Sequence, residues 1–508
     1  MTLELLDRIV IAYLVLPLVI FLAGWLRVWA AVPLLLCVAY ALRPLLAALS
    51  AAAKFPITPL QLTVAVAAGC GWTVFGGTGH FLYANFDWHL RDAVLHDLVA
   101  SPWPVGYGLL DGKESLLRAP VAFYLPAAII GKWAGLLAAH YAMAVWTAIG
   151  ASLFLLQVLS LVPSRLSVAL PVVAVIVLFS GFDILGSLLN VPRFVFLWDS
   201  ARHLEWWAGS YQYSSMTTQM FWVPNHALGG WLLIGMLFRD RLGRGPCAVS
   251  ILPVLVVAIA LWSPLAAIGL VPFVIWKVIA SATRDGYASV LDPRVWAPAL
   301  PVGLVVAAYL TLDAGAIHRS LEIGASGLAF DDLAMDFLRL AQFFLLEAGI
   351  LGIAILAIRR SSQTVLALIV LALLPMVNFG PGNDLVMRSS IPALTVLAIA
   401  ASLALFGDAP SNATRKKKIM LGCLLAIGAV TPFTEFARAV ELHAWPINLQ
   451  ATVIGAACGK YPPHYIAHLS GEAVTEILKE PHRLALGSLG PAACDNPSLG
   501  LYMKQVRW

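Results

Sequence analysis

The chain has 508 residues, of which 60% are hydrophobic and only 12% are charged, with a formal net charge of +5. An ordinary soluble domain carries about twice that share of charge, and a soluble globule of this length would need more polar surface. Six cysteines in 508 residues exclude a disulfide-rich secreted module, and the abundance of apolar residues excludes a disordered chain. We therefore expect an all-α polytopic membrane protein.

The positive charge is concentrated beside apolar segments, where Lys and Arg usually mark the cytoplasmic side of a membrane. The densest basic run, Arg415 to Lys418, lies at the start of one such segment. Nucleic-acid binding would instead require a basic stripe on a water-facing surface. No nucleic-acid partner is expected, and the lipid bilayer is the first partner that the composition predicts.

Apolar runs follow one another along the chain, and several approach the roughly 20 residues that a tilted helix needs to cross the hydrocarbon core. Because backbone groups in lipid must be satisfied within the segment, helices are expected. About 11–14 transmembrane helices are predicted. The runs are 8–25, 28–48, 58–79, 120–138, 139–161, 167–188, 223–238, 247–262, 264–281, 295–312, 337–358, 364–379, 389–406 and 418–434.

The basic flanks of these runs predict the orientation. Placing the Arg239 and Arg415 regions in the cytoplasm puts the loops 313–336 and 379–388 on the outer face, together with the tail 435–508. The same rule places the loops 80–119 and 189–222 outside. The predicted location is therefore the inner, or plasma, membrane, with these loops facing the periplasm or the cell exterior.

Three full crossings between the loops 80–119 and 189–222 would break this parity. One run must therefore be re-entrant or must cross in another way. The run 120–138 is the candidate, because proline weakens a spanning helix and Lys132 is costly in the middle of a membrane.

Two domains are expected. Residues 1–434 should form the membrane domain, with a large first extracytoplasmic loop that contains amphipathic helices. Residues 435–508 have no run of membrane length and predict a small extracytoplasmic domain. Cys458 and Cys494 fall in this tail, where an oxidising compartment would let them pair; two free thiols are the alternative.

The first outer loop holds the densest group of charged residues, the segment Asp87-Trp88-His89-Leu90-Arg91-Asp92. A carboxylate on this face can act as general base on a hydroxyl or bind a divalent metal. Asp87 is therefore the leading catalytic candidate, with His89 beside it and Arg91 as a substrate contact. The alternative is a solvated interfacial helix whose charges pair locally.

Aromatic residues follow in the same loop, at Trp103 and Tyr107. Rings at a membrane interface can contact both a sugar and a lipid headgroup, so both residues are candidates for substrate binding. An interfacial aromatic belt explains the same pattern.

Asp183 lies next to an apolar run, where a carboxylate is costly unless it is paired or borders a water-filled cavity. It is the third catalytic candidate. Glu347 lies within a predicted span and needs an internal partner for the same reason; its role is left open.

Aromatic and polar residues alternate between residues 203 and 226, a composition typical of carbohydrate binding, because sugar faces stack on rings while amides and hydroxyls bind ring hydroxyls. An amphipathic helix on the membrane is the alternative. His203 and Glu205 are too close in sequence to share one helix face, so at most one of them can point at a given site. The substrate-binding candidates here are His203, Glu205, Trp206, Tyr211, Gln212 and His226.

A third outer segment, residues 378–392, contains two glycines and a proline that predict a tight turn. Arg388 then lies where the chain enters the membrane, a position from which a guanidinium can hold a phosphate with two hydrogen bonds. The alternative is an arginine that extends to the interface. Asp384, four residues earlier, is a further substrate-site candidate or the ion-pair partner of Arg388.

This layout resembles the GT-C class of integral membrane glycosyltransferases. The matching features are Asp87 in Phe86-Asp87-Trp88-His89, the stretch from Leu117 to Pro126 that returns to the membrane, and the C-terminal tail. The resemblance implies a polyprenyl-phosphate-linked sugar donor, with Asp87 as general base and an arginine such as Arg388 on the lipid phosphate. His89 stands where a second acid would complete an acidic pair, so dependence on a divalent metal such as Mg²⁺ or Mn²⁺ is left open, and no other cofactor is expected.

The predicted function is therefore transfer of a sugar from a polyprenyl-phosphate donor to a hydroxyl of a glycan, lipid or protein acceptor on the extracytoplasmic face, as in the assembly of cell-envelope polysaccharides. A transporter or flippase of a lipid-linked or polar substrate is the main alternative. That alternative predicts polar residues in the middle of several spans and internal repeats. A non-catalytic scaffold is the third interpretation.

Overall fold

The computed structural model describes residues 2–47, 57–110, 112–190, 203–241, 249–317, 319–321, 330–380, 382–407, 415–457, 462–469 and 474–484. The predicted pair Cys458 and Cys494 lies outside these residues, as does the segment 191–202 of the second outer loop. Within the described part the chain is mostly helical, as a polytopic membrane protein requires.

Seven helical stretches in the described residues are long and apolar enough to cross a membrane. They are α1 (Leu3–Trp25), α6 (Leu136–Leu159), α12 (Pro264–Asp285), α14 with α15 (Pro293–Trp296, Ala299–Thr311), α16 with α17 (Phe330–Phe344, Ile350–Ile358), α19 with α20 (Asp384–Ser389, Ile391–Phe406), and α21 with α22 (Arg415–Gly428, Val430–Glu441). Shorter apolar stretches lie in α2 (Val28–Ala47, of which Val28–Pro44 is the apolar part), α3 (Pro59–Phe75), α7 (Leu166–Val177), α11 (Leu252–Trp262) and α18 (Ser362–Leu373). The expectation of a helical multi-pass membrane protein is confirmed.

The other helices belong mainly to the connections between these spans. They are α4 (Trp88–Ala100), α5 (Leu125–Ala134), α8 (Asp183–Asn190), α9 (Met216–Trp222), α10 (Pro224–Arg241), α13 (Tyr287–Leu291), α23 (Val453–Ala456) and α24 (Val474–Ile477). A 3₁₀ turn covers Leu204–Ala208, and a π-helical turn, Leu345–Gly349, joins α16 to α17.

The run 120–138 forms only the short helix α5. Its 10 residues extend about 15 Å, half the thickness of the hydrocarbon core. Gly135 then adopts a φ of +90°, which is readily available only to glycine, and the chain enters the long helix α6. Residues 120–138 therefore provide no full crossing.

The mostly helical fold also contains a few short strands, which the sequence does not predict. Strands β1 (Val105–Leu110) and β2 (Lys113–Leu117) form an antiparallel hairpin in the first outer loop. The tail adds β5 (Ile466–His468) beside β2 and β6 (His482–Arg483) beside β1. Strands of two to six residues are too short to show an alternating pattern, and the two tail strands gain their partners only through long-range contacts.

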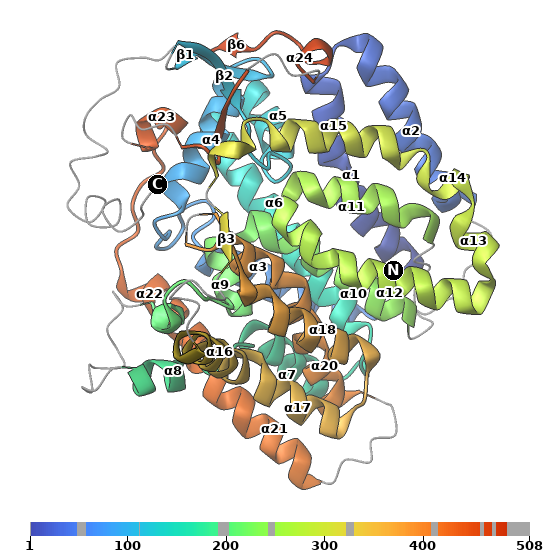
Figure 1. Ribbon diagram of the computed structural model, residues 1–508, viewed down its shortest axis with the longest axis vertical. Helices are drawn as coiled ribbons and strands as arrows, with labels where there is room; N and C mark the ends of the chain where they lie inside the picture. Colours follow the sequence, from blue (N-terminus) through green and yellow to red (C-terminus); the bar gives the residue numbers. More distant parts are fainter. Residues whose placement is uncertain are drawn as a thin grey trace.

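Three segments that the sequence predicts to be outer loops or tail are thereby joined. A second sheet joins β3 (Arg319–Leu321) to β4 (Val377–Phe379), which links the loops after α15 and α18. In the tail, the amide of Val453 donates to Asp97 Oδ2 at 3.0 Å and Trp445 Nε1 donates to the carbonyl oxygen of Ala84 at 2.8 Å. Figure 1 shows β1, β2, β6 and α24 together at the top of the molecule and α13 and α14 at the right edge.

Candidate functional site

The beginning of α12 is the point to which three polar segments are attached. Ser263 caps this helix, and its Oγ accepts a hydrogen bond from the amide of Ala266 at 3.2 Å. The same hydroxyl is hydrogen-bonded to His226 Nδ1 at 2.8 Å. Ser389 Oγ donates to the carbonyl oxygen of Leu265 at 2.7 Å. The amide of Ala122 donates to the carbonyl oxygen of Leu261 at 3.3 Å. The second outer loop, the third outer segment and the start of α5 are therefore held at one place.

Asp87 and Arg91 belong to this assembly. Arg91 Nη2 lies 3.2 Å from Asp87 Oδ2, and the Asp87 side chain is 31% exposed. Arg91 Nε donates to Asn225 Oδ1 at 3.3 Å, next to His226 in the chain. The Arg91 side chain is almost fully buried, and its Nη1 has no hydrogen-bond partner among the described residues. A buried N–H group of this kind is costly unless a ligand accepts from it.

Arg388 and Asp384 form a second ion pair of the same type. Arg388 Nη2 lies 2.8 Å from Asp384 Oδ1, one turn earlier on α19. The turn before α19 depends on Gly380, whose φ is +83° and where a Cβ would lie 2.9 Å from Asp384 Cβ. Because Ser389 is bonded to the start of α12, Arg388 lies on the same side as His226 and Arg91.

The tail supplies the last members of this group. Burial raises the pKa of Tyr465, while Arg91 and Arg388 lower it and Asp87 and Asp384 raise it. Both ion pairs therefore act on the same phenol. Burial, with Arg388 and Arg118 adding to it, lowers the pKa of His464 to about 4. We call Asp87, Arg91, His226, Asp384, Arg388 and Tyr465 the paired-arginine cluster.

A second polar group lies beneath the second outer loop. It contains four buried carboxyl groups, and we call it the carboxylate network: Asp183, Glu205, Glu347 and Glu435, with His203 and Arg438. Asp183 Oδ2 accepts from Ser180 Oγ at 2.9 Å and from Thr431 Oγ1 at 2.8 Å. Glu347, which the sequence leaves without a role, lies in the π-helical turn next to Asp183, and its Oε1 accepts from Trp207 Nε1 at 2.7 Å.

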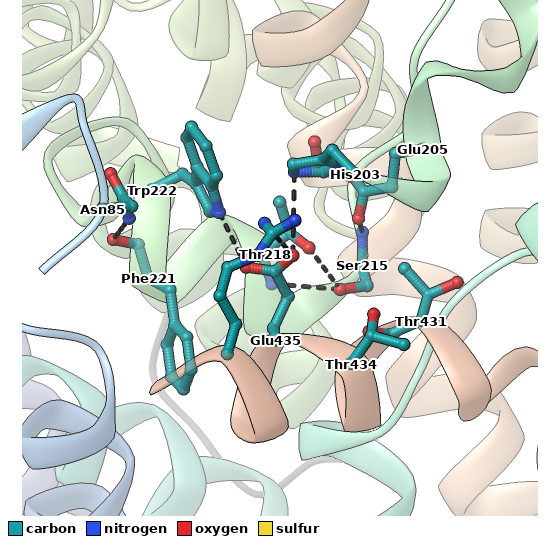
Figure 2. A network of polar contacts seen from close by, with 12 residues as sticks. Asn85, His203, Glu205, Ser215, Thr218, Phe221, Trp222, Thr431, Thr434 and Glu435 are labelled. Carbon is teal, nitrogen blue, oxygen red and sulfur yellow. Dashed lines mark hydrogen bonds and ion pairs between the residues drawn. The ribbon is translucent and has the colours of Figure 1, made fainter. Parts of the chain in front are cut away.

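Glu205 and Glu435 complete the network, as Figure 2 shows. Glu205 accepts hydrogen bonds from the amide of Ser215 at 2.9 Å and from Gln212 Nε2 at 2.7 Å. Burial, followed by the charge of Asp183, raises the pKa of Glu205 to about 8. Glu435 pairs with Arg438 at 2.9 Å and accepts from Trp222 Nε1 at 2.8 Å.

His203 lies between the rings of two tryptophans, with centroids 5.0 Å from Trp206 and 4.9 Å from Trp222. Burial, with the charge of Arg438 adding to it, lowers the pKa of His203 well below its ordinary value. His203 Nε2 lies 3.8 Å from Glu435 Oε1. Both His203 and Glu205 therefore face this network, because a 3₁₀ turn, rather than an α-helix, begins directly after His203.

The two groups are neighbours through the end of α9. The carbonyl oxygen of Phe221 accepts from Asn85 Nδ2 at 2.6 Å and from Trp88 Nε1 at 3.1 Å. Asn85 in turn accepts from the amide of Asp87 at 3.1 Å. Trp222, the next residue, donates to the carboxylate network. Figure 2 draws this connection from Asn85 through Phe221 and Trp222 to Glu435.

Several residues proposed from the sequence have structural contacts outside the paired-arginine cluster. His89 stacks on Trp445, with ring centroids 4.1 Å apart. Trp103 packs on Trp25, at 5.0 Å between centroids. Tyr107 is buried, and its hydroxyl donates to Asp97 at 2.8 Å.

Other residues proposed from the sequence lie at the edge of the carboxylate network. Tyr211 lies 5.4 Å from the ring of Phe343, and Trp206 is 46% exposed. Gln212 is bonded to Glu205 within the network. Of these three side chains, Gln212 is bonded to a carboxyl group, and none of them belongs to the paired-arginine cluster.

Sequence reasoning brings five of the six members of the paired-arginine cluster into consideration and misses Tyr465. From the sequence the tail is expected to be a separate domain. Its contacts with the first outer loop join residues more than 300 positions apart, so they leave no local pattern in the sequence. Sequence reasoning also misses Glu435, which lies directly after the predicted last span, 418–434. The structure instead continues α22 to Glu441.

The helix α4 is not solvated, because both its polar and its apolar side chains are buried, but its charges do pair locally, Arg91 with Asp87 and His96 with Asp97. Among the described residues, no group of three or more His, Cys, Asp and Glu is arranged to hold a metal ion. Dependence on a divalent metal stays a prediction without a ligand set in this part of the chain.

Compared with known proteins, the chain matches no protein-family model, no curated protein and no solved structure. Its function must therefore be inferred from the chemistry of the two polar groups. That inference depends on which charges are paired, which donors are buried without a partner, and which side of the spans they occupy.

Proposed function

We propose that the chain is a membrane glycosyltransferase that moves a sugar from a polyprenyl-phosphate donor to an acceptor hydroxyl on the extracytoplasmic face. The observation that carries the proposal is a set of two Asp–Arg pairs, 3.2 Å and 2.8 Å long, from loops almost 300 residues apart, which both lie close enough to Tyr465 to act on its phenol. The buried Nη1 of Arg91, which has no partner among the described residues, adds an unfilled donor for an anion. Guanidinium groups bind phosphate with paired, charge-assisted hydrogen bonds.

The reaction follows from these positions. Arg91 and Arg388 hold the phosphoryl oxygens of the donor at the membrane surface. The Asp87 carboxylate takes the proton of the acceptor hydroxyl as its oxygen attacks the anomeric carbon. The new carbon–oxygen bond forms as the bond to the phosphate oxygen breaks, with inversion at the anomeric carbon. The bonding electrons leave with polyprenyl phosphate, whose added charge the two guanidinium groups stabilise.

The exposed part of the second outer loop is the proposed place of the acceptor. Trp206 is 46% exposed and stacks on His203, so one face of the aromatic group is open. A sugar acceptor can stack its C–H face on such a ring. The connection through Phe221 keeps this region next to Asp87.

The test is a transfer assay on the full chain in lipid nanodiscs, with a panel of polyprenyl-phosphate sugars labelled in the sugar. We expect Asp87→Asn to lower kcat about 10²- to 10⁴-fold, the usual contribution of a general base. Because Asn removes the charge that pairs with the buried Arg91, the unfolding midpoint should fall, so turnover is compared at a temperature where both chains remain folded. Asp285→Asn is the matched control, since Asp285 is exposed and paired with Arg284. Wild-type turnover by Asp87→Asn would show that Asp87 is not the base.

A second candidate function, a proton-coupled transporter, is favoured by the carboxylate network. Four buried carboxyl groups share the network with one arginine, and Glu347 and Glu435 lie on helical stretches of membrane-spanning length. Buried carboxyl groups of this kind commonly carry protons in transporters. In proteoliposomes, an imposed pH gradient would drive a proton-coupled transporter to move the labelled lipid-linked sugar across the membrane, and the sugar would not be transferred to an acceptor. Glu347→Gln would then abolish movement, whereas Asp87→Asn would not.

A further inference from the structure

The C-terminal tail adds a strand to the sheet of the first outer loop, and this strand carries a tyrosine to the paired-arginine cluster. β5 pairs with β2 from Leu117 opposite Ile466 to Ser115 opposite His468. The amide of Arg118 donates to the carbonyl oxygen of Tyr465 at 2.7 Å. Ile466 is fully buried. The backbone therefore fixes Tyr465 at the end of β2, where the first outer loop returns to the membrane.

Arg118 strengthens this attachment from its side chain. Its guanidinium donates to the carbonyl oxygen of Pro463, in the tail, and to that of Leu310 at 3.3 Å. The tail segment is thus tied to the end of α15 as well as to β2. Ala122 follows Arg118 by four residues, and its amide donates to the carbonyl oxygen of Leu261. The chain after Arg118 therefore lies beside the start of α12.

The Tyr465 hydroxyl is available to a ligand. It forms no hydrogen bond within the described part of the chain, and Tyr465 as a whole is half-buried. Arg91, Arg388, Asp87 and Asp384 all act electrostatically on this phenol. The nearby Nη1 of Arg91 is a second donor that has no acceptor among the described residues. An oxyanion can satisfy donors of this kind, because it accepts several charge-assisted hydrogen bonds.

We propose that Tyr465 and Arg91 both donate hydrogen bonds to the phosphoryl group of a prenyl phosphate ester, so that the C-terminal tail is part of the substrate site. This inference rests on the proposed function, because it takes the lipid phosphate of the donor as the ligand. A phosphoester has several acceptor oxygens and can accept from Tyr465, Arg91 and Arg388 at once. Removal of the Tyr465 hydroxyl should therefore weaken binding of the phosphate without disturbing the prenyl chain.

The experiment measures binding rather than transfer, with the full chain in nanodiscs. The probes are a short-chain prenyl monophosphate, the matching prenol and inorganic phosphate. We expect the wild type to bind the prenyl phosphate more tightly than either of the other two. Tyr465→Phe should weaken binding of the prenyl phosphate about tenfold or more, the usual effect of losing a hydrogen bond to a charged group. Tyr287→Phe, at a tyrosine that is 69% exposed, is the matched control and should bind as the wild type does.

The outcomes separate this inference from the proposed function. If Tyr465→Phe binds prenyl phosphate as tightly as the wild type, the role of Tyr465 is wrong while phosphate recognition stands. If the wild type binds the prenol as tightly as the prenyl phosphate, both proposals fail. An unchanged thermal unfolding midpoint for Tyr465→Phe, together with unchanged binding of the prenol, assigns a tenfold loss to the missing hydroxyl rather than to misfolding.

Discussion

Glu205 illustrates how burial changes the chemistry of a single side chain in this protein. The sequence presents it as a candidate contact for a sugar, beside His203 and Trp206. In the folded chain it is fully buried, and its two oxygens accept hydrogen bonds from Ser215 and Gln212. Burial and the neighbouring charge of Asp183 raise its pKa to about 8, so the carboxyl group holds its proton at neutral pH.

The raised pKa predicts how stability depends on pH. The pKa of Glu205 rises from the ordinary value of 4.5 to about 8 on folding, so the folded chain binds this proton more tightly than the unfolded chain. Its contribution to stability is fully present below the unfolded value and is lost as the pH rises through the folded value. We expect the thermal unfolding midpoint to fall between pH about 5 and pH about 9, and Glu205→Gln to reduce that fall.

The measurement is the unfolding midpoint of the detergent-solubilised chain at both pH values. Glu441→Gln is the control, because Glu441 is exposed and should leave the dependence on pH as it is in the wild type. A Glu205→Gln variant with the full wild-type fall in midpoint would contradict the assignment of this proton to Glu205.

The close approach of two elements positions Arg388. A Cβ at Gly269 would lie 2.1 Å from the carbonyl oxygen of Ser389, so α12 and α19 touch backbone to backbone. Small residues allow such approaches between helices in membranes. Ser389 is bonded to Leu265 from the same side, and Arg388 is its neighbour.

We expect Gly269→Ala to displace α19 and with it the guanidinium of Arg388. The unfolding midpoint should fall, and the KM for the polyprenyl-phosphate donor should rise about tenfold, because one charge-assisted contact is lost. The control is Gly422→Ala, at a helical glycine with nothing within 4 Å of an added Cβ. Equal behaviour of the two variants in both measurements would argue against a positioning role for this contact.

The arrangement of the whole molecule predicts which loops share a face. β2 and the tail lie on one side, and α13 lies apart from them at the right edge of Figure 1. We expect Lys113→Cys, in a chain whose native cysteines are replaced, to react with a membrane-impermeant maleimide in intact cells. Ser289→Cys, at an exposed position next to Tyr287, should react only after the membrane is permeabilised. The opposite labelling pattern would place the paired-arginine cluster on the cytoplasmic face.

The strands of the C-terminal tail could not be predicted from the sequence. Residues 466–468 and 482–483 are too few to show a strand pattern of their own. They become strands because β1 and β2 offer free edges to them. A pairing over more than 300 residues leaves no local signal, whereas the apolar runs of the spans are local and therefore visible.

A helical membrane protein is predictable from the sequence alone, because scarce charge and long apolar runs are properties of composition and local order. The sequence also predicts most of the ionisable residues of the two polar groups, since a chain with 12% charged residues has few candidates. The grouping of these residues became visible with the three-dimensional structure. The fold brought Asp87, Arg388 and Tyr465 within electrostatic reach of one another, whereas His89, Trp103 and Tyr107 contact Trp445, Trp25 and Asp97. The physical reason is that ion pairs, buried donors and strand edges are satisfied by whichever partners the fold brings near, and nearness in space is not encoded in any one segment.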